Sequence, residues 1–189
     1  MSAPLLCPWA FAPDVGAIDF GALWAAGYRG LLFDVDNTLV PHGADSTPEV
    51  DALFAQLKDL GFRCLMLSDN GPARLRRFLR NIDADFIDNA GKPRKKGYRE
   101  ALRRLGLPRE QVVMIGDQLF TDILGANRCG IPNILVRYIG YDPDADPGKR
   151  RRLEAKLLRR YENSPAMGRL NEAIRKEAPV YEQTEKAVL

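Results

Sequence analysis

Short apolar runs alternate with amphipathic helical segments along most of the chain, and this alternation limits the fold more than any other feature. The runs occupy residues 31–33, 62–67, 85–87, 112–115 and 131–136, each of a length typical of strands. An alternating order of strands and helices favours right-handed crossovers between parallel strands. We therefore expect an α/β protein with a Rossmann-like fold, in which helices cover both faces of a five-stranded parallel sheet.

The chain divides near residue 140. Residues 1–140 are expected to form the core, including an N-terminal extension, and residues 141–189 a linker followed by a basic helical tail. Seven basic residues lie between residues 149 and 160, around leucines at helical spacing. This tail either packs on the core or extends from it.

Several classes of protein are disfavoured by the composition. The three cysteines are widely spaced and the chain has one histidine, which argues against a structural zinc site and predicts inert thiols. Neither a signal peptide pattern nor a run of eighteen apolar residues is present, so a cytoplasmic protein is expected. The net charge of +3 does not by itself indicate a nucleic-acid partner.

Polar side chains follow the predicted strands at the points where those strands end. Asp34 and Asp36 follow the first apolar run, and Ser68, Asp88 and Asp117 follow three others. In open parallel sheets, ligands bind at the carboxyl ends of the strands. These residues therefore predict one site at that edge.

Two carboxylates at one strand end can divide two chemical tasks. Asp34 can attack a phosphorus atom to form an aspartyl-phosphate, while Asp36 protonates the leaving oxygen and later deprotonates water. Mg²⁺ held by Asp34 and Asp117 would offset the charge of an approaching phosphate. Ser68 and Lys92 would contact the phosphoryl group.

Four segments, taken in order, resemble the motifs of the haloacid dehalogenase (HAD) superfamily. They are DVDNT at residues 34–38, Ser68, Lys92 with its following proline, and GDQLFTD at residues 116–122. The resemblance spans roughly residues 31 to 137. It implies an aspartyl-phosphate mechanism with Mg²⁺ as cofactor.

The resemblance also assigns roles to individual residues. It makes Asp34 the nucleophile and a metal ligand, and Asp36 the acid/base and a metal ligand through its backbone carbonyl. Ser68 and Lys92 become phosphate contacts and Asp117 a metal-binding acid. In the same way, Asp122 is implied as a second acid that contacts the metal through water.

Within that superfamily the sequence is similar to the YqeG branch of subclass III phosphatases, which is itself similar to the phosphatidylglycerophosphate phosphatases. The segments that carry this likeness are residues 27–30, 34–40 and 116–122. It implies a phosphomonoester hydrolase, with phosphatidylglycerophosphate as the leading substrate.

No large cap domain is expected. About ten residues separate Thr38 from Pro48, and about two dozen separate Ser68 from Lys92, which is too short for the caps of related proteins. The site should be open, or covered by a second copy in a homo-oligomer. An open site suits a phosphorylated small molecule, a lipid headgroup or a phosphorylated macromolecule.

Further phosphate contacts lie beside the main motifs. Asn37 and Thr38 either bind substrate or order the turn after the nucleophile. Asp69 and Asn70 follow Ser68 and are also candidates. Asp69 stands where related sequences often carry a neutral residue, and we expect its carboxylate to face away from phosphate.

Some residues near the motifs have competing interpretations. Lys95 and Lys96 compete with Lys92 for the phosphate, although the proline after Lys92 favours that residue. His42 lies close enough to meet a leaving group, but an exposed loop histidine is the commoner case.

Two questions about partners stay open. The basic tail could dock on its own core, bind anionic lipid at the inner face of a membrane, or bind RNA. The alternative function is a non-catalytic adaptor of the same fold, which binds RNA, a ribosome or a protein partner through the arginine-rich residues 74–80 and 94–104. Intact acids in all motifs argue against the adaptor.

Overall fold

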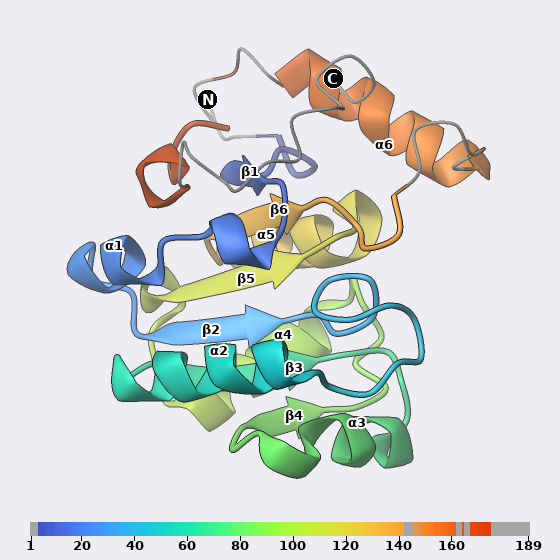
Figure 1. Ribbon diagram of the computed structural model, residues 1–189. Helices are drawn as coiled ribbons and strands as arrows, with labels where there is room; N and C mark the ends of the chain where they lie inside the picture. The colour runs from blue at the N-terminus through green and yellow to red at the C-terminus, as the bar shows by residue number, and fades with distance from the viewer. Residues whose placement is uncertain (1–3, 142–145, 147, 162–163, 165–166, 175–189) are drawn as a thin grey trace.

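A parallel sheet of six strands forms the centre of the described part of the molecule (Figure 1). The computed structural model describes residues 4–141, 146, 148–161, 164 and 167–174. The strand order is β1-β6-β5-β2-β3-β4, which places β2 between β5 and β3. The strands are β1 (Ala10–Ala12), β2 (Gly30–Phe33), β3 (Arg63–Leu67), β4 (Asp85–Ile87), β5 (Val112–Gly116) and β6 (Asn133–Val136).

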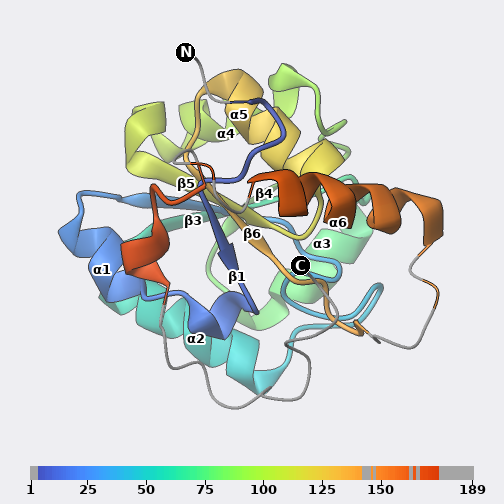
Figure 2. The ribbon, with the colours of Figure 1, turned by 90° about the horizontal axis from the view of Figure 1, so that it is seen from above.

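Helices cover both faces of this sheet, as the sequence predicted. The helices are α1 (Phe20–Ala25), α2 (Pro48–Asp59), α3 (Pro72–Phe78), α4 (Lys95–Leu105), α5 (Leu124–Cys129) and α6 (Gly148–Tyr161). Figure 2 shows α1 and α2 on one side of the sheet and α4 and α5 on the other. Single-turn 3₁₀ segments occur at Val15–Ala17, Leu79–Asn81, Arg109–Gln111 and Asn171–Ala173, and a π-helical turn at Leu119–Ile123.

The side chains of the central strand β2 pack against the helices on both faces of the sheet. Leu31 and Phe33 pack into a cluster with α1, α2 and α3, whereas Leu32 packs into a second cluster with α4 and α5. Successive side chains of a strand point to opposite faces, so β2 contributes to both clusters. Burial of each such side chain stabilises the fold by about 1.5–3 kcal/mol.

The predicted α/β fold is confirmed, but the sheet has one strand more than expected. The additional strand β1 pairs in parallel with β6 at the edge, with Ala10 opposite Ile134. Its three residues include two alanines, which are poor strand formers, and its conformation depends on pairing with β6. A local pattern therefore does not reveal it.

The helix that follows β5 begins with an irregular turn. Its first turn, Leu119–Ile123, is π-helical and then continues into α5. Inside this turn the Oδ2 atom of Asp122 accepts a hydrogen bond of 3.0 Å from the backbone N–H of Gln118. Such wide turns are often found at functional sites.

The predicted basic tail helix corresponds to α6, which packs beside the β1 and β6 edge (Figures 1 and 2). Leu158 is buried against Leu119 and Leu135, so this helix lies on the core. Its first turn lies at the carboxyl-end side of the strands (Figure 1). The expected linker falls largely on residues 142–145 and 147, outside the described residues, as does the tail from residue 175 onward.

Nothing among the described helices is both long and apolar enough to span a bilayer.

Candidate active site

Three of the predicted site residues come together because their strands are neighbours. Phe33 of β2 lies opposite Met66 of β3 and Ile115 of β5. Asp34, Ser68 and Asp117 follow these strands directly, so the parallel register brings them to one edge of the sheet.

A cluster of three buried carboxylates lies at this edge. Asp34, Asp117 and Asp122 each offer an oxygen, and these oxygens lie within 4.8 Å of one another. Lys92 reaches into the cluster, and its Nζ lies 2.6 Å from Oδ1 of Asp34 and 2.7 Å from Oδ1 of Asp122. One buried ammonium thus compensates part of the negative charge of three acids.

Burial and crowding shift the pKa values in this acid cluster. Burial raises the pKa of Asp122 to about 7, with the charges of Asp34 and Asp117 adding to the rise and Lys92 opposing it. Burial also raises the pKa of Asp117, against the opposing charge of Arg151. For Lys92, burial alone would lower the pKa, but the neighbouring carboxylates outweigh it and hold the pKa well above its usual value.

Arg151 of α6 is a contact that sequence reasoning missed. Its guanidinium pairs with Oδ2 of Asp117 and donates a hydrogen bond of 2.6 Å to the backbone carbonyl of the same residue. Thr38 lies on the other side, with its Oγ1 3.2 Å from Oδ2 of Asp34 and 3.3 Å from Oδ1 of Asp117. A hydroxyl has one proton, so it can donate to only one of these two acids at a time.

The carboxylate of Asp36 is held apart from the acid cluster. It accepts hydrogen bonds from Nδ2 of Asn70 at 2.7 Å, from Nη2 of Arg74 at 2.9 Å and from the N–H of Gly43 at 3.1 Å. Burial alone would raise the pKa of Asp36, but these donors outweigh it and lower the pKa. The exposed His42 places Nδ1 3.2 Å from Oδ2 of Asp36.

Arg74 was expected only as part of a basic surface, yet it belongs to this site. Its side chain is 13% exposed, and besides Asp36 it donates a hydrogen bond to the carbonyl of Ala44. It therefore ties the loop after the first motif to α3. No motif signals this role, because the pairing depends on how the two segments fold together.

The segment after β3 is ordered by its own side chains. Oγ of the buried Ser68 lies 3.2 Å from the backbone N and 3.0 Å from Nδ2 of Asn70. Asp69 is exposed on the rim of the pocket, where its Oδ1 accepts the backbone N–H of Lys92 at 3.0 Å. This bond gives the carboxylate of Asp69 a structural role, because it links the segment after β3 to the segment that carries Lys92.

An open hollow of about 270 Å³ makes Asp34, Ser68 and Lys92 accessible to solvent. Lys95 and Lys96 are exposed and do not line it, whereas Lys92 does. Asp88, which follows β4, is not part of its wall. The lining residues are Asp34, Asp36, Asn37, His42, Ser68, Asp69, Asn70, Lys92, Gln118, Thr121 and Arg150.

Gly116 at the end of β5 leaves space that Asp122 occupies. A Cβ atom at this position would lie 2.5 Å from the carboxyl carbon of Asp122. The missing side chain therefore makes room for Asp122 beside Lys92.

The donors present fit a hard divalent cation. The acid cluster offers only oxygen ligands, which Mg²⁺ prefers, and its members repel one another in the absence of a cation. Asp34, Asp117 and Asp122 would hold the ion. The carboxylate of Asp36 is bound to Arg74 and Asn70 instead.

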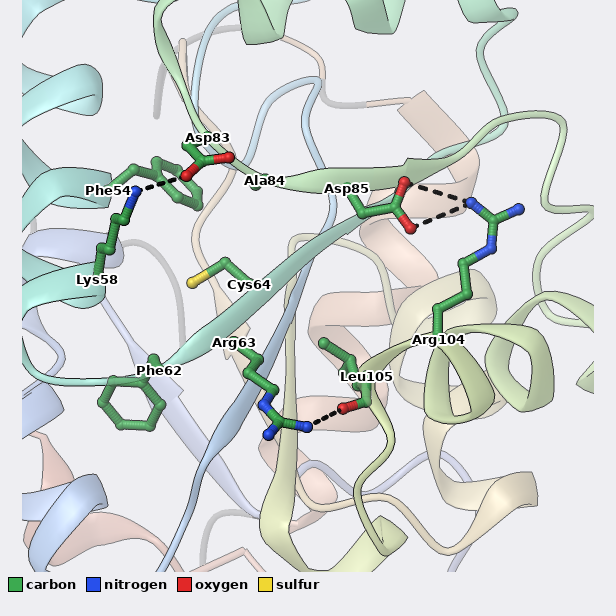
Figure 3. A pocket seen from close by; sticks show the side chains of 10 residues that line it. All are labelled: Phe54, Lys58, Phe62, Arg63, Cys64, Asp83, Ala84, Asp85, Arg104 and Leu105. Carbon is green, nitrogen blue, oxygen red and sulfur yellow. Dashed lines mark hydrogen bonds and ion pairs between the residues drawn. The ribbon is translucent and has the colours of Figure 1, made fainter.

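A second hollow, of about 340 Å³, lies at the amino ends of β3 and β4 (Figure 3). Figure 3 shows two ion pairs in its wall, Lys58 with Asp83 and Arg104 with Asp85, and Arg63, which donates to the carbonyl of Leu105. Cys64 lies between them, and burial raises the pKa of its thiol to about 12. This hollow therefore offers no reactive thiolate.

Cys64 should accordingly react very slowly with Ellman's reagent in the folded protein. At pH 8 its thiol stays protonated, because the pH lies far below its raised pKa, and only the thiolate attacks the reagent. Unfolding in guanidinium chloride should restore rapid reaction. Fast modification of Cys64 in the native protein, located by mass spectrometry, would contradict this assignment.

Comparisons with known proteins agree with the fold. A sequence profile of haloacid dehalogenase-like hydrolases matches residues 43–130. "Probable phosphatase YqeG" of Bacillus subtilis (strain 168) is 38% identical over 109 residues, which cover 57% of this chain and 63% of that protein. A chloroplastic phosphatidylglycerophosphate phosphatase 1 of Chlamydomonas reinhardtii is 32% identical over 145 residues, covering 70% and 53%.

One solved crystal structure has the same fold, with a TM-score of 0.53 and 18% identity over 71% of this chain and 83% of that one. The chain spans between about half and two thirds of the length of the two curated relatives. The profile match begins after Asp34 and Asp36, whereas the structure places these residues beside the matched part. Taken together, residues 43–130 are similar to the haloacid dehalogenase-like hydrolases, and the chain is similar in sequence to the YqeG phosphatase and to a phosphatidylglycerophosphate phosphatase.

Proposed function

We propose that this protein is a Mg²⁺-dependent phosphomonoester hydrolase that works through an aspartyl-phosphate on Asp34. The observation that supports this most is the buried acid cluster with Lys92 at its centre, open to solvent through one hollow. Burying three acids and a lysine lowers the free energy of unfolding, because the charged groups lose their hydration. Such clusters of ionisable groups with shifted pKa values are typical of functional sites.

In the first step, a carboxylate oxygen of Asp34 attacks the phosphorus atom of the substrate and the bond to the leaving oxygen breaks. Lys92 lies 2.6 Å from Oδ1 of Asp34, so it orients this carboxylate and stabilises negative charge on the phosphoryl oxygens. Ser68 lines the same hollow and can donate its hydroxyl proton to one of them. Bound Mg²⁺ would supply further charge compensation for the phosphoryl group.

Asp36 would transfer the protons. The donors around it keep it as a carboxylate in the free protein, which is the form that accepts a proton from water when the aspartyl-phosphate is hydrolysed. The approach of a phosphate dianion raises the pKa of a nearby carboxylate, which favours the protonated form that the leaving oxygen needs. After one cycle, Asp34 and Asp36 return to their starting states.

Phosphatidylglycerophosphate is our proposed substrate. Two features support it: the name of the relative from Chlamydomonas reinhardtii, and the basic helix α6 beside an uncapped site. Phosphate release should be measured from this lipid, sugar phosphates and nucleotides, with Mg²⁺ or with EDTA. Preference for a sugar phosphate or nucleotide would overturn the substrate, and absence of release from every compound would overturn the activity.

Mg²⁺ binding should weaken below pH 7. Burial raises the pKa of Asp122 to about 7, so below this pH its carboxyl group holds a proton that the cation must displace. The apparent affinity, measured from the rise in thermal midpoint with added Mg²⁺, should fall by up to about tenfold per pH unit. Asp122→Asn should flatten this dependence, and a flat profile in the unmodified protein would contradict the role of Asp122.

The adaptor alternative has less support. An adaptor that binds through surface arginines has no use for a buried acid cluster, whose burial is unfavourable without a ligand. Arg74 and Arg104, two of the arginines proposed for such a surface, are paired with Asp36 and Asp85. Binding of RNA without any phosphatase activity would restore this alternative.

A further inference from the structure

A groove of about 490 Å³ lies between α6 and the end of β6, separate from the hollow that exposes Asp34. Its volume falls within the range of small-molecule binding sites. Most of its exposed lining is apolar, and its floor is formed by Phe11, Leu119, Leu135, Val136 and Leu158. Tyr138 and Tyr141 line it as well.

Basic side chains surround this apolar floor. Arg137, Arg152, Lys156 and Arg159 line the groove, and Glu154 is the acid on α6 that lines it. Nε of Arg137 is buried and has no acceptor within the described part of the chain. An apolar floor with a cationic rim is complementary to a ligand that has an apolar tail and an anionic head.

The groove and the candidate active site share a wall. Asp117 of the acid cluster lines the groove, while Arg150 at the start of α6 lines the hollow that holds Asp34. The next residue, Arg151, lines the groove and pairs with Asp117. The groove therefore lies next to the hollow that holds Asp34, with the first turn of α6 and the Arg151–Asp117 pair between them.

We propose that this groove binds an acyl chain of a phospholipid whose terminal phosphomonoester lies in the active site. The inference rests on the proposed phosphatase function and deepens it, because it assigns the part of the protein that selects the apolar part of the substrate. A sugar phosphate or a nucleotide would place polar groups on the apolar floor without hydrogen-bond partners. A phosphopeptide backbone would face the same penalty.

The first test compares two phosphomonoesters that differ only by an acyl chain. Calorimetry on Asp34→Asn protein with Mg²⁺ would measure binding of dodecanoyl lysophosphatidate, below its micelle concentration, and of glycerol 3-phosphate. Each methylene group that leaves water strengthens binding roughly threefold to fourfold. Burial of only part of the chain should thus give the lysophosphatidate an affinity about a hundredfold higher or more.

A variant that fills the groove tests the location. Ala155 lines the groove and is partly exposed on α6, so Ala155→Trp should occupy the space with little change to the core. It should lower the lysophosphatidate affinity at least about tenfold and leave glycerol 3-phosphate binding unchanged. Ala55→Trp, at an exposed position on α2, is the matched control and should change neither.

A second variant, with a smaller expected effect, tests the basic residues at the edge of the groove. Arg159→Glu reverses an exposed charge at the groove and should weaken lysophosphatidate binding severalfold, whereas Arg99→Glu on α4 makes the same change elsewhere. Equal effects of these two variants would overturn the proposal.

The outcomes distinguish a failure of the acyl-chain proposal from a failure of the proposed phosphatase activity. If both phosphomonoesters bind with equal affinity and the unmodified protein releases phosphate from both, the proposal that the groove binds an acyl chain is wrong. The proposed phosphatase function would be unaffected. Chain-dependent binding that Ala155→Trp removes, without release of phosphate from any substrate, would support the groove and overturn the catalytic function.

Discussion

Asp34→Asn should abolish phosphate release, lowering kcat by on the order of 10⁴-fold or more, as expected for loss of a covalent nucleophile. An amide nitrogen or oxygen cannot replace the carboxylate in attacking phosphorus. The fold should persist, because the change removes one of three crowded buried acids and leaves Lys92 paired with Asp122. Initial rates with saturating substrate and Mg²⁺, together with a thermal melt, would measure both effects.

Asp36→Asn is the matched control for this result. It should slow substrates with poor leaving groups by about 10²- to 10⁴-fold, the usual contribution of a general acid or base. With p-nitrophenyl phosphate, whose leaving group needs little protonation, the variant should release a burst of nitrophenol and retain phosphate on Asp34. If Asp34→Asn protein kept activity within tenfold of the unmodified protein, the nucleophile would have to be another residue.

Lys92→Met should have the largest effect on stability, lowering the free energy of unfolding by about 3–5 kcal/mol near pH 8. The side chain of Lys92 is 4% exposed, and its removal leaves Asp34 and Asp122 buried without their ammonium partner. The loss should shrink towards pH 5. There the freed carboxyl groups take up protons in the folded state, whereas at higher pH they must stay charged or draw a proton from solution.

Urea denaturation at pH 5 and pH 8 would measure this difference. Lys95→Met provides the control, since Lys95 is exposed three residues away and its loss should change stability by less than about 0.5 kcal/mol. Added Mg²⁺ should recover part of the loss at pH 8, because a cation between the same carboxylates offsets their repulsion. Equal stability of the two variants would show that Lys92 does not neutralise the cluster.

Much of the fold was predictable because its information is local. The spacing of apolar residues around Leu31 and Leu65 predicts strands, and Thr47 with Pro48 predicts the start of α2. In the structure the side chain of Thr47 accepts a hydrogen bond from the N–H of Val50. Asp34, Ser68 and Asp117 were predictable as a group, because residues that follow neighbouring parallel strands meet at one edge.

Other features depend on contacts between distant parts of the chain. Strand β1 takes its extended form by pairing with β6, which lies more than 120 residues later. Arg74 reaches Asp36 only when α3 lies beside the loop after β2, and Arg151 reaches Asp117 only when α6 folds onto the core. Arginines at these positions are typical of exposed helix faces, so no local pattern distinguishes them.

The sequence alone determined the class of fold, the strand-end position of the acids and the residue types available for phosphoryl transfer, since backbone periodicity and side-chain chemistry are properties of short segments. Tertiary structure decided how those groups are charged and what surrounds them. It placed Lys92, rather than Lys95 or Lys96, among buried carboxylates, and it brought α6 beside Asp117 to form the apolar groove. Burial, pKa and cavity shape depend on the packing of residues far apart in the chain, and therefore arise only when the elements fold together.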